Sequence, residues 1–385
     1  MEQEFADGGR IARVTPQAVR ELACWPGRPC VSIYLPLDPT HPNIDAARLE
    51  LKDLARDARH QLTAMSFRRP AVEKLLAPVE ELFGAERWLL GSRGYGLFSA
   101  PNFAMQVRVD VAVPSVSVVA GGFVVTPLVS ALLDADRFYV LAVSQNQAHF
   151  FRGQRDALID VAVPDLPASR ADALWYEHHE RQLNVHGGSH LGVDRITGTL
   201  HGSPSARDLR KQQLLRYFRF VDEALWSVLH DETAPLLVAG ADHELAVYRE
   251  ANRYPHLAGT VDVGNPERLD NADLHDKVWP VAAAVLDAPR RALVERVGAS
   301  PESLTSIPAI VAACREGRVA ALLAQPTRLR WGRIDAAEGH LERRPGDIEL
   351  VSAAIGAALA QGAAIYPAAP GELPGDVSVA AVARY

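Results

Sequence analysis

The sequence contains few cysteines and no excess of basic residues, and both features narrow the range of possible functions. Its 385 residues include three cysteines, Cys24, Cys30 and Cys314, an odd number with no Cys-x-x-Cys spacing. This pattern supports neither a disulfide framework nor a zinc knuckle, and it fits a reducing cytoplasm. The formal net charge of −7 argues against indiscriminate nucleic-acid binding. Any contact with nucleic acid therefore has to use a local basic patch.

Neither a secretory signal nor an uninterrupted membrane span is expected from the sequence. The first residues, MEQEFADGGR, contain neither a basic n-region nor an apolar h-region, so no ordinary secretory signal is expected. Residues 111–133 carry no charge, but Pro114, Gly121, Gly122 and Pro127 interrupt them. We interpret this stretch as sheet strands and an interdomain connection, and we expect no membrane partner.

The length of the chain and its hydrophobic content of 48% predict a large core and more than one domain. The first domain, residues 1–128, is expected to be α+β. A strand, two helices and three further strands are predicted in it, at residues 29–36, 47–62, 70–83, 87–90, 94–99 and 103–110.

The second domain, residues 129–288, opens with a β-hairpin at 138–153. Residues 164–203 then show little periodicity, which indicates a long loop that is either functional or disordered. A long helix follows, and after it the sequence predicts a buried strand at 235–239, a helix that begins at Asp242 and a helix near 271–287. This alternation indicates an α/β layer.

The third domain, residues 289–385, is expected to be a compact α/β sandwich. Its predicted elements are a helix at 304–316, strands at 318–325 and 329–332, a helix with Ile348, Val351, Ile355 and Leu359 on one face, and a final strand. The predicted fold class is therefore mixed α+β and α/β, with three domains that each contain a mixed sheet and helices.

Residues 184–220 are the most informative about function. Gly187 and Gly188 can adopt backbone angles that are closed to other residues, so the chain there can approach a partner closely. Ser203 is expected to cap the following helix and Pro204 to be its first residue. From Leu214 onward, apolar residues at steps of three and four predict one buried stripe.

Upstream of Leu214, cations occupy the sector of the helix in which the stripe would continue. Residues 205–220 contain five cations against Asp208 alone. We expect the start of this helix to protrude from the core and to contact RNA phosphates, and partial protonation lets loop histidines add to that contact. The predicted RNA-binding residues are Arg207, Arg210, Lys211, His190 and His201.

Several segments, taken in their order, resemble the bacterial homologues of archaeo-eukaryotic peptide-chain release factors, a superfamily that includes Pelota. In the middle domain the hairpin FYVLAVSQNQAHFFRG, the long loop and the helix LLRYFRFVDEALW follow the family's order. In the third domain the similar segments are REGRVAALLAQ at 315–325, Trp331-Gly332, the acidic-led helix at 347–367 and VAAVARY at 379–385. The resemblance covers about residues 129–385 and implies release-factor-like middle and C-terminal domains.

The resemblance implies a ribosome-associated translation factor whose partners are ribosomal RNA and the tRNA (A) site. The middle-domain loop would reach toward the tRNA acceptor end, and the third domain would contact the ribosome or a translational GTPase. Ribosome rescue, hibernation and peptide release are alternative roles at this point. No cofactor and no metal are expected.

Family members that release peptides carry Gly-Gly-Gln at the tip of this loop, where it helps water attack the ester of peptidyl-tRNA. This sequence contains no Gly-Gly-Gln. The candidate tips are His186-Gly187-Gly188-Ser189, in which serine replaces glutamine, and residues 202–206, directly before the helix. We therefore expect binding without efficient peptidyl-tRNA hydrolysis. Hydrolysis assisted by backbone N–H groups of the Gly-Gly-Ser loop is the alternative.

The histidines of the same loop offer a function of another class. They are His178, His179, His186, His190 and His201, and His186 and His190 have a spacing found in helical zinc sites. The glycines between these two histidines disfavour a helix, and no nearby cysteine or acidic pair completes a tetrahedral set. A metal-dependent hydrolase that uses the histidine loop is thus the competing hypothesis, which metal analysis would test.

Overall fold

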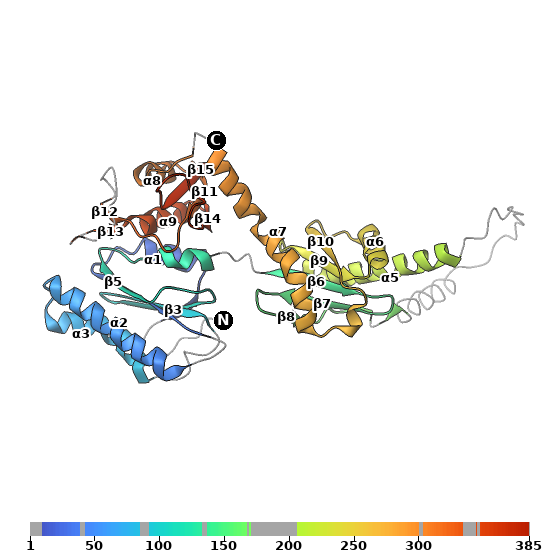
Figure 1. The fold of residues 1–385 in the computed structure, drawn as a ribbon, viewed down its shortest axis with the longest axis horizontal. Coiled ribbons are helices and arrows are strands. Elements are labelled where there is room, and N and C mark those ends of the chain that lie inside the picture. The colour runs from blue at the N-terminus through green and yellow to red at the C-terminus, as the bar shows by residue number, and fades with distance from the viewer. Residues whose placement is uncertain are drawn as a thin grey trace, which may run out of the picture. The chain divides into compact units, whose positions relative to one another are not determined.

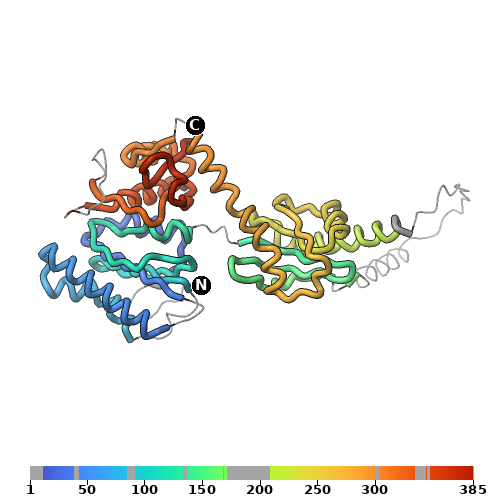
Figure 2. The backbone as a smooth tube through the Cα atoms, in the orientation of Figure 1, coloured from blue at the N-terminus to red at the C-terminus, as the bar shows by residue number. Residues whose placement is uncertain are grey.

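The protein is described by a computed structural model over residues 10–38, 43–84, 92–132, 137–167, 169–170, 206–299, 303–333, 344 and 347–384 (Figures 1 and 2). Two compact units are present. Unit 1 comprises Met1–Asp134 and Pro289–Tyr385, and unit 2 comprises Ala135–Ala288. The contacts thus group the predicted first and third domains, and the division into three domains stays a prediction. Both units combine mixed sheets with helices, which confirms the predicted fold class.

Unit 1 is built around a five-stranded sheet with the order β1-β4-β3-β2-β5. Only the edge pair β1 and β4 is parallel. The strands predicted at 29–36, 94–99 and 103–110 are confirmed, whereas residues 87–90 lie outside the described residues. The sheet consists of β1 (Arg10–Arg13), β2 (Cys30–Pro36), β3 (Gly94–Ala100), β4 (Phe103–Val109) and β5 (Val116–Ala120).

Two helices and a 3-10 turn cover one face of this sheet (Figure 1). They are α2 (Ile44–Ala64), α3 (Arg69–Glu80) and η1 (Glu81–Gly84). Helix α2 begins where the Asn43 side chain accepts a hydrogen bond from the Ala46 N–H at 3.0 Å. Its predicted apolar stripe, from Ala47 to Leu62, is buried against the sheet.

The other face of the sheet packs against elements from both ends of the chain, so one hydrophobic core is shared between them (Figure 1). Tyr34 and Phe98 of the sheet and Ile355 of α9 belong to this core. The elements on this side are α1 (Pro16–Ala23), η3 (Thr126–Ala131), α8 (Ile307–Arg315), β11 (Val319–Ala324), β12 (Trp331–Gly332), β13 (Ile348–Glu349), α9 (Leu350–Ala360), β14 (Ala364–Pro367) and β15 (Val379–Ala383).

Two sequence interpretations of unit 1 need correction. Ile348 does not lie on the helix face, because β13 pairs it with Gly332 and α9 begins only at Leu350. Residues 111–133 contain one strand, β5, and the 3-10 helix η3, whereas several strands were expected. Pro127 at the start of η3 explains the second difference, since proline favours the first positions of a helix and leaves no N–H for a sheet.

A buried carboxylate joins these segments. Glu349, only 2% exposed, accepts hydrogen bonds from the N–H groups of Val351 at 3.1 Å and Ser352 at 2.6 Å. It also accepts the Arg330 N–H at 2.9 Å and the Thr126 hydroxyl at 2.5 Å. The carboxylate therefore satisfies the first turn of α9 and ties it to η3 of the N-terminal part.

Unit 2 is a three-layer structure on a sheet with the order β10-β9-β6-β7-β8. Strands β10, β9 and β6 are parallel to one another. Strand β7 pairs with β6, and β8 pairs with β7, in antiparallel orientation. Helices α5 and α6 cover one face and α7 covers the other (Figure 1). The elements are β6 (Phe138–Val143), β7 (Ala148–Gly153), β8 (Leu158–Asp160), α5 (Ala206–Leu229), β9 (Leu236–Gly240), α6 (Asp242–Ala251), β10 (Leu257–Asp262), η5 (Pro266–Arg268) and α7 (Asn271–Ala299). From Pro289 on, the residues of α7 belong to unit 1.

The hairpin predicted at 138–153 is confirmed as β6 and β7, and the predicted strand at 235–239 is β9. Strands β8 and β10 were not predicted. Strand β8 has three residues, too few for a visible alternation of apolar and polar side chains. Helix α7 extends to Ala299, beyond the predicted end near residue 287.

Candidate functional site

Helix α5 consists of two parts with different surroundings. Its predicted apolar stripe is confirmed: Leu214, Phe218, Val221 and Leu225 are all at most 6% exposed, and Val228, the last predicted residue of the stripe, is partly buried. The residues from Leu209 to Gln213 are exposed, and Leu209 has 46% of its surface open to solvent. The helix start thus extends past the core of unit 2, as expected from the cations in the sequence (Figures 1 and 2).

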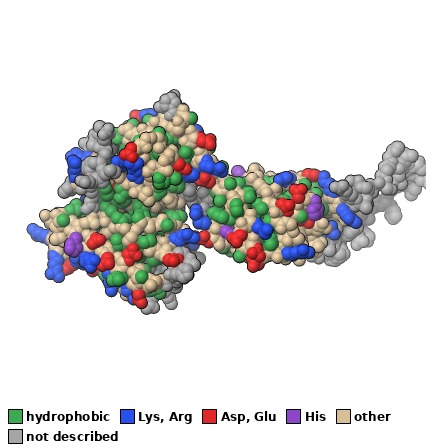
Figure 3. Space-filling view, viewed as in Figure 1, with side chains coloured by type: hydrophobic (Ala, Val, Ile, Leu, Met, Phe, Trp, Pro, Cys, Tyr) green, Lys and Arg blue, Asp and Glu red, His purple; other side chains and the backbone are tan. Residues whose placement is uncertain are grey.

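Two of the predicted phosphate-binding cations are exposed on this part of α5. Arg210 and Lys211 are open to solvent, and the ammonium group of Lys211 donates to Glu250 of α6 at 2.6 Å. Arg207 lies in the first turn of α5, and its side chain is outside the described part of the chain. On the face drawn in Figure 3, Lys and Arg side chains are interspersed with Asp and Glu over the described surface. On this face, a basic area that contacts RNA can therefore cover only a small part of the surface.

The predicted loop residues lie outside the described residues. They are His186, Gly187, Gly188, Ser189, His190 and His201, together with the second candidate tip at 202–206 apart from Ala206, which begins α5. The proposed cap Ser203 and Pro204 lie outside as well. Their assignments stay predictions.

Polar side chains gather where the parallel strands of unit 2 end, and sequence reasoning missed them. We call Ser144, Gln145, His243, Glu244 and Glu267 the strand-end cluster. The hydroxyl of Ser144 donates to the Glu267 carboxylate and accepts the N–H groups of Asn146 at 3.0 Å and Gln147 at 2.9 Å. Gln145 and His243 form a side-chain hydrogen bond of 3.1 Å. The cluster connects the β6–β7 turn to the start of α6 and to η5.

Glu244 anchors the cluster. It is 4% exposed and accepts the Ala241 N–H at 3.1 Å, so it caps α6 from the first turn of that helix. Burial raises the pKa of its carboxyl, and hydrogen bonds from the backbone at Ala241 and Gln145 oppose this effect. Gly240 is the last residue of β9, and a Cβ on it would lie 2.6 Å from the Val143 carbonyl oxygen. Glycine is thus required where β9 ends beside β6.

The cluster bears on the predicted loop because it holds the β6–β7 turn, which contacts the start of that segment. The carbonyl oxygen of Asn146 in the β6–β7 turn accepts the Arg170 N–H at 3.1 Å. The signal in the sequence was the position of these residues: Ser144 directly follows a strand, and Glu244 stands at the third position of a helix. A serine nucleophile would need a hydrogen bond between its hydroxyl and a base such as histidine. Here His243 contacts Gln145, and the Ser144 hydroxyl donates to Glu267. The hydrogen bonds of the cluster therefore fix the geometry of the backbone.

Within the described residues, no group of three or more His, Cys, Asp or Glu side chains is arranged to hold a metal ion. The five histidines of the competing hydrolase hypothesis lie outside those residues. A search of the described helices finds none that combines the length and the apolar character needed to cross a membrane.

Solved structures of translation factors align with this chain at low identity. An archaeal translation termination factor, aRF1, is 14% identical, with 97% of this chain and 99% of that chain covered and a TM-score of 0.22. The Thermoplasma acidophilum Pelota protein is 12% identical, with coverage of 76% and 80% and a TM-score of 0.24. Dom34 of S. cerevisiae, a translation termination-like factor, is 8% identical, with coverage of 78% and 76% and a TM-score of 0.37. No curated protein matches the chain.

The family comparison is specific to the middle of the chain. Residues 137–318 match the bacterial archaeo-eukaryotic release factor family 3. The matched range includes the β6–β7 hairpin, α5 and the strand-end cluster, whereas most of the third-domain segments that resemble the family lie beyond it. Over residues 137–318 the chain is similar to the bacterial homologues of the archaeo-eukaryotic release factors.

Proposed function

We propose that this protein is a ribosome-associated translation factor that binds the tRNA (A) site in ribosome rescue or hibernation. The observation that carries the proposal is the family match over residues 137–318, within which α5 begins with exposed cations directly after the predicted loop. In this proposal the loop at 164–203 reaches toward the tRNA acceptor end. The C-terminal part of unit 1 contacts the ribosome or a translational GTPase.

The start of α5 is proposed to bind RNA phosphates through Arg207, Arg210 and Lys211. The existing ion pair of Lys211 with Glu250 does not oppose this role. Both side chains are about half exposed, at 54% and 48%, and exposed pairs of this kind contribute about 0.2–1 kcal/mol. Lys211 can therefore exchange Glu250 for a phosphate at little cost.

We further propose that binding occurs without efficient peptidyl-tRNA hydrolysis. By the resemblance of the sequence, with His186-Gly187-Gly188-Ser189 as the tip, Ser189 takes the place of the glutamine of a peptide-releasing loop. A serine hydroxyl reaches less far than a glutamine amide and can form a hydrogen bond with its own turn, so it is poorly suited to hold a water at the ester. If release occurs, we expect backbone N–H groups at Gly187 and Gly188 to support it, and Gly188→Ala to reduce it more than Ser189→Ala.

Co-sedimentation with ribosomes at several salt concentrations tests the proposal. The triple variant Arg207→Ala, Arg210→Ala, Lys211→Ala is expected to bind more weakly, with a log–log salt slope lower by up to about one unit per lost contact. The matched control removes three exposed cations elsewhere in unit 2, Arg249, Arg268 and Lys277. Equal behaviour of the two variants, or wild-type binding by the first, would contradict the phosphate contacts.

Two measurements on the same material separate the alternatives. Multiple-turnover release of labelled peptide from stalled ribosomes by the wild-type chain would replace the binding role with hydrolysis by the Gly-Gly-Ser loop. Stoichiometric zinc in the purified protein, without ribosome binding, would favour the metal-dependent hydrolase. Tight binding without release is the result that we expect.

A further inference from the structure

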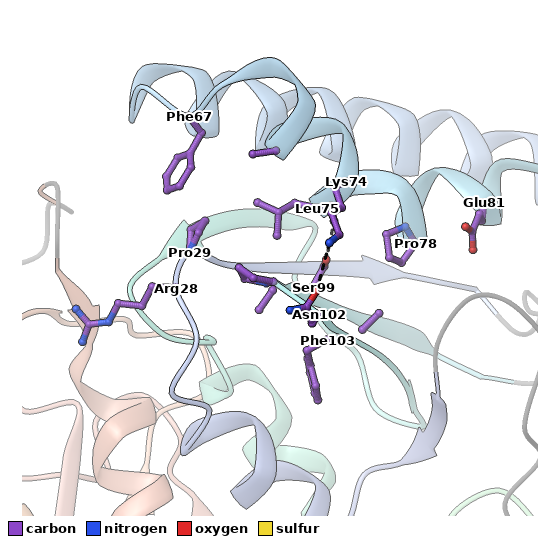
Figure 4. A pocket seen from close by; sticks show the side chains of 14 residues that line it. Arg28, Pro29, Phe67, Lys74, Leu75, Pro78, Glu81, Ser99, Asn102 and Phe103 are labelled. Atoms are coloured by element: carbon purple, nitrogen blue, oxygen red, sulfur yellow. Dashed lines mark hydrogen bonds between the residues drawn. The ribbon is translucent and has the colours of Figure 1, made fainter.

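A groove in the N-terminal part of unit 1 plays no role in the proposed translation function. Its volume is about 500 Å³, which lies in the range of small-molecule sites. One wall is formed by Ala71, Leu75 and Pro78 of α3, with Phe67 at the near end of the helix (Figure 4). Pro29 lines the groove beside the sheet, whereas the ring of Phe103, which also belongs to the lining, points away from α3 (Figure 4). The side chains from Phe67 to Pro78 thus give the groove an apolar surface along α3.

The walls of the groove are held in place by buried contacts. The Ser99 hydroxyl of β3 donates to the Leu75 carbonyl oxygen of α3 at 2.6 Å, and Ser99 is only 1% exposed. Phe103 packs against Trp25, with ring centroids 4.1 Å apart. Because these contacts link helix, sheet and α1 region, the groove is formed before any ligand arrives, which lowers the entropic cost of binding.

The middle of the groove presents hydrogen-bond donors. Lys74 donates to the Asn102 side-chain oxygen at 3.3 Å, a distance beyond the usual range for a strong bond. Asn102 occupies a left-handed conformation, with φ of 60°, in the turn between β3 and β4, and its side chain is directed toward Lys74 (Figure 4). Its amide N–H groups and the remaining N–H groups of Lys74 are donors that an external acceptor can use.

The other charged residues of the groove, Arg28 and Glu81, lie away from Lys74 and Asn102. Figure 4 shows the Arg28 guanidinium directed away from the groove, and Glu81 beyond Pro78 at the far end. Lys74 is therefore the charge nearest the middle of the groove. An acceptor of negative charge fits this position better than a neutral one.

We propose that the groove binds a small organic carboxylate with an apolar, preferably aromatic, body. The body lies along Phe67, Leu75 and Pro78, where it loses contact with water. One carboxylate oxygen accepts from the Lys74 ammonium and the other from the Asn102 amide, which replaces the long bond between these two side chains.

Calorimetric titration of the full chain with 3-phenylpropionate, and with 3-phenylpropanamide as its neutral counterpart, tests the proposal. We expect the acid to bind about tenfold more tightly than the amide. Lys74→Met keeps most of the aliphatic stem and removes the charge, so it is expected to weaken the acid about tenfold and to leave the amide unchanged. Lys277→Met, which removes an exposed lysine of unit 2, is the matched control and should change neither affinity.

A second variant tests the apolar part of the site. Ala71 is exposed on the wall of α3, and Ala71→Trp is expected to fill the groove and to abolish binding of both compounds while the circular dichroism spectrum stays native. Equal affinity of the wild type for acid and amide, or an unchanged affinity of Lys74→Met for the acid, would overturn the proposal. Absence of binding up to about 10 mM acid would overturn it as well.

Discussion

Each unit places a buried glutamate at the start of a helix, but the two glutamates connect different parts of the chain. Glu349 at the start of α9 accepts a hydrogen bond from Thr126, 223 residues away in the sequence. Glu244 in the first turn of α6 accepts one from Ala241, three residues away. The same residue type in a similar helical position thus assembles distant segments in unit 1 and orders a local turn in unit 2.

The difference follows from how each unit is built. Unit 1 takes its core from both ends of the chain, so a polar contact between those ends stabilises the pairing of the two parts. Unit 2 is one continuous segment, and contacts such as the hydrogen bond between Gln145 and His243 join elements within that segment. The segment that carries the basic start of α5 is therefore ordered by contacts within itself.

Among the variants that test this difference between the units, Glu349→Ala is expected to change stability most. The change leaves the N–H donors of Arg330, Val351 and Ser352 without this acceptor, and the Thr126 hydroxyl keeps only its contact with the Ser352 hydroxyl at 2.9 Å. We expect the free energy of unfolding of unit 1 to fall by about 3–5 kcal/mol. Hydrogen exchange read by mass spectrometry reports the two units separately. Glu349→Gln, which keeps an acceptor oxygen, should lose less, and an equal loss in unit 2 would contradict the assignment.

The stability of unit 1 is expected to depend on pH through the buried carboxyl of Glu349. Burial raises the pKa of the Glu349 carboxyl above its ordinary value of 4.5, against the opposing hydrogen bonds from Arg330, Ser352 and Thr126. A raised pKa in the folded state means that the stability from this group is complete below pH about 4.5 and is lost as the pH rises through the folded-state pKa. Relative to Glu349→Gln, the wild type should therefore lose stability across that window.

Labelling of the buried thiols Cys30 and Cys314 during urea unfolding measures this effect, since both belong to unit 1. The same pH profile for wild type and Glu349→Gln would show that the carboxyl keeps its ordinary pKa. A difference of opposite sign would show that the hydrogen bonds outweigh burial.

A smaller effect is expected from Glu244→Ala. The variant removes the acceptor for the Ala241 N–H and should lower the stability of unit 2 by about 1 kcal/mol, as the loss of a helix cap does. Protection of α6 and of the β6–β7 turn against hydrogen exchange should fall together, while unit 1 stays unchanged. Unaltered exchange in the turn would show that the strand-end cluster does not couple the two elements.

The smallest effect is expected from Lys211→Ala. Its ion pair with Glu250 is exposed, so the stability of unit 2 should change by less than about 0.5 kcal/mol in thermal unfolding. Asp222→Ala is the contrasting variant, because Asp222 is 4% exposed and accepts both the backbone N–H and the guanidinium of Arg253. If Lys211→Ala destabilised unit 2 as strongly as Asp222→Ala does, weaker ribosome binding by the Lys211→Ala variant could not be assigned to a lost phosphate contact.

Periodic elements could be predicted from the sequence because their signal is local. The stripe from Leu214 to Leu225 and the β6–β7 hairpin are apolar patterns within single segments. Elements that depend on a distant partner were missed or misplaced. Strand β1 exists by pairing with Met105 to Arg108 of β4, and Ile348 became a strand residue by pairing with Gly332. Neither pairing has a signature in the segment itself.

Composition and periodicity alone determined that this is a mixed α/β protein and that α5 has a basic start ahead of an apolar stripe, because side-chain type and spacing specify both. Only the tertiary structure decided that the two ends of the chain share one core, that Glu349 meets Thr126, and that Lys211 meets Glu250. The physical reason is that these contacts depend on how separate elements pack, and residues far apart in the sequence carry no local pattern that records their neighbours.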